Sequence, residues 1–141
     1  MFTSSYHHTI DAKNRLFIPA KFREEFGDEI VISPSIRGNY LNVYSLEEWN
    51  RYLEPIKKLD RAKAEEYFRF MNGNSSRQPL DATGRVQISA ELIAFAGLEN
   101  KAVVIVGCGD YAEIWSEEEY EKSVKHADID KIRMVLESAG L

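Results

Sequence analysis

"HTIDAKNRLFIPAKFREEFG", from His8 to Gly27, decides the fold, because it sets two strand-like runs around a short polar turn and ends in a short helical pattern. Seventy residues further on, "QPLDATGRVQISAELIAFAG", from Gln78 to Gly97, repeats the same order. The residues matched by this shift include Asp11 with Asp81, Asn14 with Gly84, Arg15 with Arg85 and Gly27 with Gly97. The chain therefore keeps an aspartate and an arginine at the same places in two turns.

A second match follows the first in the same order. With a shift of 71, "YLNVYSLEEW" from Tyr40 to Trp49 lies on "YAEIWSEEEY" from Tyr111 to Tyr120. Two extended matches at nearly the same spacing indicate a duplicated unit. A unit of roughly 45 residues made of short strands cannot bury much apolar surface alone, so the two units are expected to pair edges or exchange hairpins.

Each unit is predicted to be mostly strand. Alternation puts Leu16 and Ile18 on one face of the run after the first turn and Arg15 and Phe17 on the other. In "DAKN" and "DATG" the aspartate can accept hydrogen bonds from backbone two residues on, and asparagine or glycine tolerates a positive φ. The further strands are predicted at Glu29–Ser33, Tyr40–Tyr44, Ala102–Val106 and Tyr111–Trp115.

Helices are predicted after each turn and outside the units. Pro19 suits a first helical position, and Ser89 at the matching place suits an N-cap. Ser45 and Ser116 each precede a glutamate by three residues, which is typical of a capping box. "NGNSSRQP", Asn72 to Pro79, is predicted to be a linker.

The tail from Glu117 to Gly140 is predicted to be an amphipathic helix. Its apolar stripe is made of Ile129, Ile132, Val135 and Leu136. The expected division of the chain is repeat 1 over 5–47, a helical linker over 48–75, repeat 2 over 76–119 and a C-terminal helix over 120–141.

The composition is that of a globular protein. Apolar residues make up 44% and charged residues 29% of 141, and no apolar run is long enough to span a membrane. The N-terminus has no signal-peptide pattern, and the single cysteine, Cys108, excludes an internal disulfide, so a reducing cytoplasm is expected. The net charge of −5 does not by itself favour nucleic-acid binding. Whether such binding is indicated therefore depends on how the charges are distributed along the chain.

The sequence contains no convincing catalytic or metal site. Asp11 and Asp81 could form a carboxylate pair, but each sits in turn context, so capping of its own turn is favoured. His7 and His8 are neighbours on a strand and point to opposite faces, so they cannot easily share a metal ion. We therefore expect no enzyme activity, no cofactor and no metal. A small hydrolase would need a nucleophile and base that the sequence lacks.

Basic residues gather around the first turn. The window from Asp11 to Arg23 has a net charge of +3, whereas the matching window from Asp81 to Ile93 has −1. A basic hairpin tip on an acidic body suits nucleic-acid binding, although an ordinary charged loop would look similar. The candidate DNA-binding residues are Lys13, Asn14, Arg15, Lys21, Arg23 and Arg85. The candidate turn-structuring residues are Asp11, Asp81 and Gly84.

"YHHTIDAKNRLFIPAKFRE" (Tyr6–Glu24), "LDATGRVQIS" (Leu80–Ser89) and the chain length resemble the MraZ family of bacterial transcriptional regulators, within the AbrB-like superfamily. The resemblance covers essentially the whole chain. It implies an α+β fold with a mostly β core. Two swapped-hairpin units would form a pseudo-dimer within the chain, similar to a double-psi β-barrel, with peripheral helices between the units and at the C-terminus.

The same resemblance implies a function. Such a protein would bind tandem boxes in double-stranded promoter DNA as a ring larger than a dimer. It would regulate the division and cell-wall gene cluster, usually its own operon. The protein would be cytoplasmic and associated with the nucleoid, and it would bind neither a membrane nor a small-molecule substrate. This sequence departs from the family pattern at three positions: Asn14 stands where glycine is usual, and Ser89 stands where proline is usual. Thr83 of the second motif stands at the place where the first motif often has lysine. The alternative is a structural ring-forming protein that does not bind DNA.

Overall fold

A computed structural model describes every residue from Met1 to Leu141. The two repeats contain the same elements in the same order. In the first they are β1 (Ser5–Thr9), β2 (Arg15–Phe17), α1 (Ala20–Phe26), β3 (Glu29–Pro34), β4 (Leu41–Ser45) and α2 (Leu46–Leu53). In the second they are β5 (Ser76–Pro79), β6 (Arg85–Gln87), α4 (Ala90–Ala96), β7 (Ala102–Gly107), β8 (Ala112–Ser116) and α5 (Glu117–Tyr120). The remaining elements are the 3₁₀ helix η1 (Glu54–Lys58), α3 (Arg61–Asn74), the π-helical turn η2 (Glu121–Lys125) and α6 (Ile129–Ser138).

The strands form two antiparallel sheets, which confirms the predicted α+β class. One sheet has six strands in the order β1-β7-β8-β4-β3-β5, and the other pairs β2 with β6. The first strand of each repeat pairs with the third strand of the other, since β1 lies on β7 and β5 lies on β3. The pairs β4–β8 and β2–β6 also join one repeat to the other. Neither repeat therefore completes a sheet by itself.

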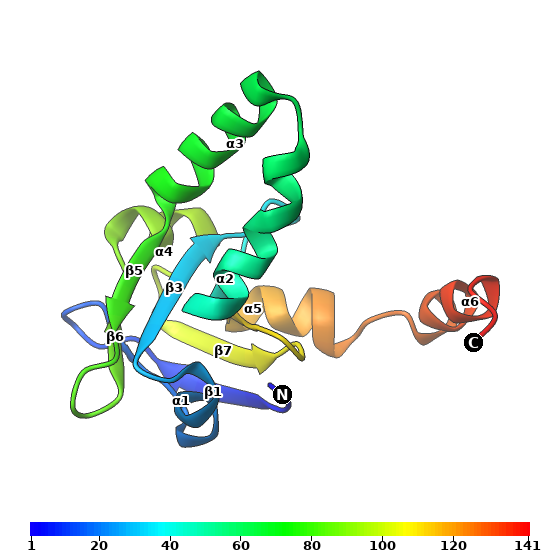
Figure 1. Cartoon of the computed structure of the whole chain (residues 1–141). Helices are drawn as coiled ribbons and strands as arrows, with labels where there is room; N and C mark the ends of the chain where they lie inside the picture. Colours follow the sequence, from blue (N-terminus) through cyan, green and yellow to red (C-terminus); the bar gives the residue numbers. More distant parts are fainter.

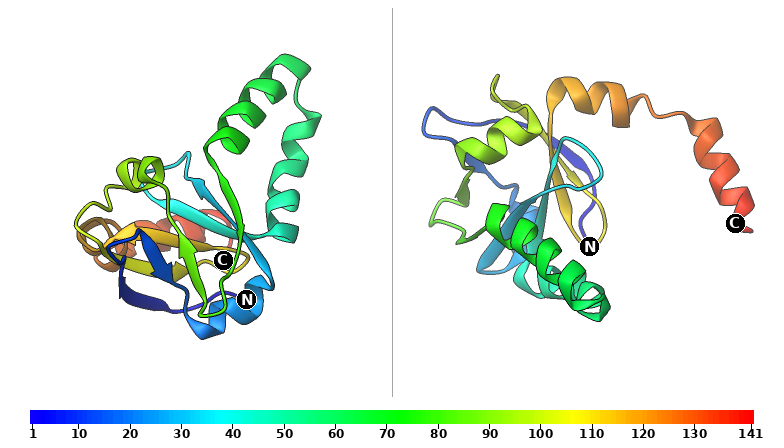
Figure 2. Two further views of the ribbon diagram at one scale, coloured as in Figure 1. Left: turned by 90° about the vertical axis from the view of Figure 1, so that its left-hand side faces the viewer. Right: turned by 90° about the horizontal axis from the view of Figure 1, so that it is seen from above.

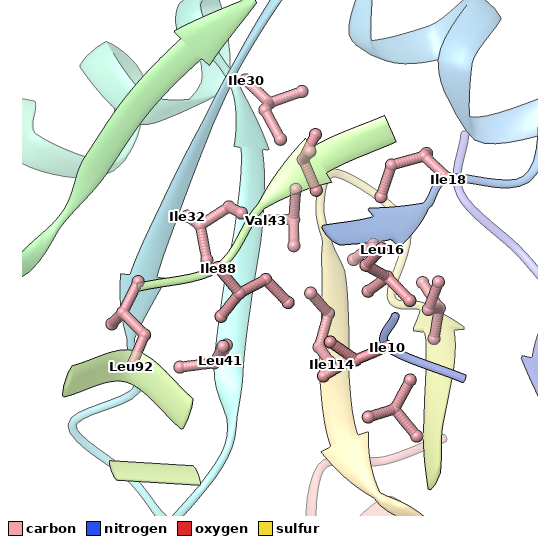
Figure 3. Close-up of a cluster of buried hydrophobic side chains, with 14 of the residues drawn as sticks. Ile10, Leu16, Ile18, Ile30, Ile32, Leu41, Val43, Ile88, Leu92 and Ile114 are labelled. Atoms are coloured by element: carbon pink, nitrogen blue, oxygen red, sulfur yellow. The ribbon is translucent and has the colours of Figure 1, made fainter. Parts of the chain in front are cut away.

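The main core lies between the inner face of the large sheet and the β2–β6 ribbon (Figure 3). Leu16 and Ile18 of the first repeat are fully buried there, together with Val86 and Ile88 of the second, whereas Phe17 stays exposed as alternation predicts. Phe22 of α1 closes the same cluster. Both repeats thus contribute matched residues to one core, which rigidly fixes the ribbon that carries the two turns.

The outer face of the same sheet carries a second, smaller cluster. Val31 and Tyr44 point outward there and are covered by Trp49 and Leu53 of α2 and by Met71 of α3. Figure 1 shows α2 and α3 rising from this face as a pair of helices. The helical segment between the repeats therefore packs on the sheet through its lower end.

Local signals place most helix starts. Ser45, Ser89 and Ser116 accept hydrogen bonds from the backbone N–H three residues on, so all three act as N-caps. Pro19 was expected at the first position of the helix, and this prediction is wrong by one residue. Pro19 is the N-cap of α1, with φ −52° and ψ 141°, because the chain is still extended where it leaves β2.

The predicted linker from Asn72 to Pro79 is wrong. Asn72 to Asn74 end α3, and Ser76–Pro79 forms β5. Pairing of β5 with β3 supplies backbone hydrogen bonds that outweigh the local turn preference, and Arg77 Nε donates to Glu29 Oε2 at 2.7 Å across that pair. Pro79 lies at the end of the strand, where a missing N–H is tolerated.

The expected C-terminal helix is divided. α5 and η2 are followed by a break, and α6 starts anew at Asp128, whose side chain accepts from the N–H groups of Asp130 and Lys131. Figure 1 shows α6 projecting away from the sheets, and its apolar stripe is exposed. None of the helices combines the length and the apolar composition that a membrane span requires.

Candidate nucleic-acid interface

Two loops lie at the same end of the molecule. The first loop (residues 10–14) joins β1 to β2, and the second loop (residues 80–84) joins β5 to β6. Figure 1 and the right-hand view of Figure 2 both show them on the side opposite α6. Ile18 N donates to Gly84 O at 2.9 Å and Ile88 N donates to Asn14 O at 2.8 Å, so each loop is bonded to the chain that leaves the other.

Each loop is organised by its aspartate. Asp11 Oδ1 accepts from the backbone N–H of Lys13 and of Arg15, both at 2.9 Å. Asp81 Oδ1 accepts in the same way from Thr83 at 2.9 Å and Arg85 at 2.8 Å. The two aspartates therefore close separate turns and do not act as a carboxylate pair.

The same aspartates hold the two arginines. Arg15 Nε donates to Asp11 Oδ2 at 2.8 Å, and Arg85 Nε donates to Asp81 Oδ2 at 3.2 Å and to Thr83 Oγ1 at 2.8 Å. About a third of each arginine side chain is exposed, 32% and 33%. The bonds use Nε alone, so the terminal amino groups of both guanidinium forks remain able to bind a planar acceptor pair.

These contacts also keep the carboxylates ionised. The backbone N–H of Arg15 is the main cause of a lowered pKa at Asp11. The backbone N–H of Arg85, followed by the Thr83 hydroxyl, lowers the pKa of Asp81 to about 2. Both turns therefore carry a fixed negative charge behind the arginine at neutral pH.

The turn conformation requires the residues found at its last position. Asn14 has φ +59° and Gly84 has φ +83°, so the asparagine tolerates the conformation that glycine supplies in the second loop. Glycine is required at position 84 for a second reason, because an added Cβ would lie 2.5 Å from Nη1 of Arg23. Asn14 Oδ1 accepts from Lys101 Nζ at 2.5 Å.

The remaining candidate cations differ in their surroundings. Lys13 and Lys21 are exposed, and neither ammonium group has a partner in the chain. The backbone oxygen of Lys13 accepts from Gln87 Nε2 at 2.7 Å, which links the first loop to β6. Arg23 is half-buried, with its guanidinium 4.9 Å from the centre of the Phe17 ring. Arg23 therefore packs between Phe17 and Gly84 of the second loop.

The charges that neighbour each loop in space differ from those of the sequence windows, because Arg23 of the first window lies against Gly84 of the second loop. Lys101 O accepts from Ile10 N beside the first loop, and Asp28 O accepts from Leu80 N at the equivalent place beside the second. The first loop thus has an extra lysine as its neighbour, whereas the second has an aspartate. Sequence reasoning missed Lys101 and Gln87, because both reach the first loop from the other repeat. Only the repeat register could have indicated them.

The chain matches known proteins along most of its length. The family model described as "MraZ protein, putative antitoxin-like" matches residues 1–69 and 71–134. The chain is 35% identical over 144 residues to the transcriptional regulator MraZ of Clostridium acetobutylicum, covering 100% of both chains. It is 40% identical to the protein of the same name from Thermoanaerobacter sp., over 92% of this chain and 90% of that one. The match to the one from Ligilactobacillus salivarius is 39% identical over 91% and 90%.

Proposed function

This chain belongs to the MraZ family of transcriptional regulators, and we propose that it binds tandem boxes in double-stranded promoter DNA through its two loops. The family is a DNA-binding one with two repeated domains, and its members are regulators and not enzymes. This membership favours DNA binding over the alternative of a structural ring-forming protein that does not bind DNA.

One observation carries the proposed binding mode. Each loop holds an arginine by Nε and presents the other two nitrogens of the fork at the same end of the molecule. A guanidinium fork is the side-chain group that pairs with O6 and N7 of guanine in the major groove. Lys13 and Lys101 would add phosphate contacts around the first loop, and Lys21 would add one from the start of α1. Asn14, Arg23 and Arg85 complete the proposed DNA-binding set, Asn14 from the first loop, Arg23 from α1 and Arg85 from the second loop.

The proposed target is the upstream region of the protein's own operon, in the division and cell-wall gene cluster, and the protein would be nucleoid-associated in the cytoplasm. DNase footprinting on that region tests the proposal. We expect a row of evenly spaced protected boxes. Uniform coverage that follows protein concentration without a preferred sequence would contradict it.

A ring larger than a dimer is the proposed form of the active protein. Two features support it: β1 and β5 leave free edges at the two ends of the large sheet, and the stripe on α6 is exposed. A ring would repeat the loops at fixed spacing and so raise the effective concentration for tandem boxes. No cofactor or small molecule enters this binding mode.

The exchange of strands between repeats supports a swapped-hairpin pseudo-dimer within the chain. We propose that the two sheets together make up the double-psi-like β-barrel of this pseudo-dimer. In this proposal the repeats span 5–47 and 76–119. The helical segment at 48–75 and the C-terminal segment at 120–141 would then serve packing and assembly.

Lys13→Ala is expected to flatten the salt dependence of DNA binding. The Lys13 ammonium has no partner in the chain, so it can neutralise a phosphate and release counterions, which lowers the slope of log affinity against log salt by about 0.9 for each contact. Titrations of one operator fragment at several salt concentrations measure the slope. Lys63→Ala, which removes an exposed lysine of α3, should leave it unchanged, and equal slopes for all three proteins would exclude the phosphate contact.

Arg85→Ala is expected to weaken DNA binding less than Arg15→Ala does. Both arginines are held by an aspartate, but the window that holds Arg85 has a net charge of −1, and the backbone of Asp28 is bonded to Leu80 of the second loop. Binding of both variants to one operator fragment, with melting temperatures alongside, measures the difference. If Arg85→Ala loses as much affinity at unchanged stability, the two loops are equivalent readers.

A further inference from the structure

A pocket lies on the outer face of the large sheet, away from both loops. Its volume is about 300 Å³, at the lower end of the range for small-molecule sites. Asn42 and Tyr44 of β4 form part of its wall, and Tyr52 of α2 and Tyr111 form another part. Because neighbouring residues of β4 alternate, the core-facing Leu41 and Val43 separate this pocket from the β2–β6 ribbon.

Buried polar groups cross the sheet at the pocket. Ser33, Asn42 and Glu113 are partners on β3, β4 and β8, and they are 0%, 8% and 9% exposed. Glu113 accepts from Trp115 Nε1 at 2.9 Å. Ser33 Oγ and Asn42 Oδ1 are buried without any hydrogen-bond partner in the chain. Such groups are rare because desolvation without a hydrogen bond is costly, so the carboxamide of Asn42 calls for a partner in the pocket that it lines.

The wall around Asn42 is aromatic. The ring of Tyr44 lies 5.3 Å from that of Tyr52 and 5.4 Å from that of Tyr111, centre to centre, in stacked orientations. Tyr40, which also lines the pocket, stacks on Trp115 at 4.2 Å. Burial raises the pKa values of Tyr44 and Tyr111, so both rings stay neutral. The wall therefore offers flat, uncharged surfaces to a planar ligand.

The rim of the pocket carries charged side chains, and only some of them have ionic partners. Arg51 is paired with Glu47 and Glu48 of its own helix. Arg37 and Asp110 are exposed and have no ionic partner in the chain, although both line the pocket. The rim therefore keeps one cation for an anionic group and one carboxylate for hydroxyl donors.

We propose that this pocket is a binding site for a nucleotide, with the base against the tyrosines and its edge hydrogen-bonded to the Asn42 carboxamide. An asparagine amide offers one acceptor and one donor side by side, which matches the adjacent amino group and ring nitrogen of adenine. Arg37 takes the phosphate, and Asp110 takes ribose hydroxyls. The site lies on the sheet face opposite the ribbon, so a bound nucleotide does not compete with DNA at the loops.

Isothermal titration of the full-length chain with AMP tests the proposal, with adenosine and ribose 5-phosphate as partial ligands. We expect AMP to bind more tightly than adenosine and ribose 5-phosphate to bind least. Asn42→Leu should weaken AMP binding at least roughly tenfold, because it removes a bidentate contact. It should not lower the melting temperature, since an unpartnered polar group is lost. Arg37→Ala, at the exposed rim, should reduce AMP affinity to that of adenosine.

Ser33→Ala is the matched control, because it removes the other unpartnered group of the row, which does not line the pocket. It should leave AMP binding unchanged. The proposal is overturned if AMP, GMP, CMP and UMP all fail to bind at millimolar concentration, or if ribose 5-phosphate binds as well as AMP. It is also overturned if Asn42→Leu binds AMP normally, or changes the size of the assembly in place of nucleotide affinity, which would assign the pocket to contacts between copies.

Discussion

Replacing Arg15 by alanine is expected to abolish specific binding to promoter DNA while leaving the assembly intact. The guanidinium is fixed by its Nε–Asp11 bond at 2.8 Å, so the fork is already oriented before DNA arrives. One bidentate contact with guanine contributes about 1–3 kcal/mol of discrimination. Several copies engage tandem boxes at once, so the losses accumulate and the preference for the operator over random DNA should disappear.

A gel shift with operator and scrambled fragments, combined with light scattering, measures both parts of this result. Arg15→Lys keeps the charge but loses the fork, so it should retain non-specific binding and still lose the operator preference. Arg61→Ala removes an arginine that is 93% exposed on α3 and should leave the preference unchanged. Near-normal operator affinity of Arg15→Ala would rule out the loop as the reader.

The variant Asp11→Asn distinguishes the positioning of the Arg15 guanidinium from the conformation of the first loop. The amide oxygen can still accept the backbone hydrogen bonds that close the turn, but its charge-assisted bond to Arg15 Nε is lost. We expect a smaller loss of operator affinity than for Arg15→Ala, at nearly unchanged stability. A variant with full affinity would show that the fork needs no anchor.

The sequence indicated these loops because their chemistry is local. Asp11 bonds residues two and four positions on, so the motif itself encodes the turn, and its second copy encodes the second turn. The contact of Lys101 with Asn14 joins residues 87 positions apart, and no local pattern carries such information. The strand β5 was missed for the same reason, since only its pairing with β3 makes a polar stretch into a strand.

The apolar stripe of α6 shows the opposite case, in which the sequence pattern is clear but its partner lies outside one chain. Periodicity correctly predicted that Ile129, Ile132, Val135 and Leu136 share a face. These side chains remain 44–69% exposed in the folded chain. An exposed apolar face of this kind marks an interaction site, which is the physical basis for expecting assembly through α6.

Ile132→Asp combined with Val135→Asp is therefore expected to break the assembly into smaller species. A carboxylate on this stripe would have to be desolvated at any contact between copies, whereas the single chain keeps its fold because α6 packs on nothing within it. Affinity for a fragment with tandem boxes should fall by about 10²–10⁴-fold through lost multivalency, and affinity for a single box should change little. Sedimentation velocity and titrations on both fragments measure the two effects. Arg133→Ala alters charge on the same helix without touching the stripe and should keep the assembled size. An unchanged sedimentation coefficient for the double variant would place the contacts between copies elsewhere, at the free edges of β1 and β5.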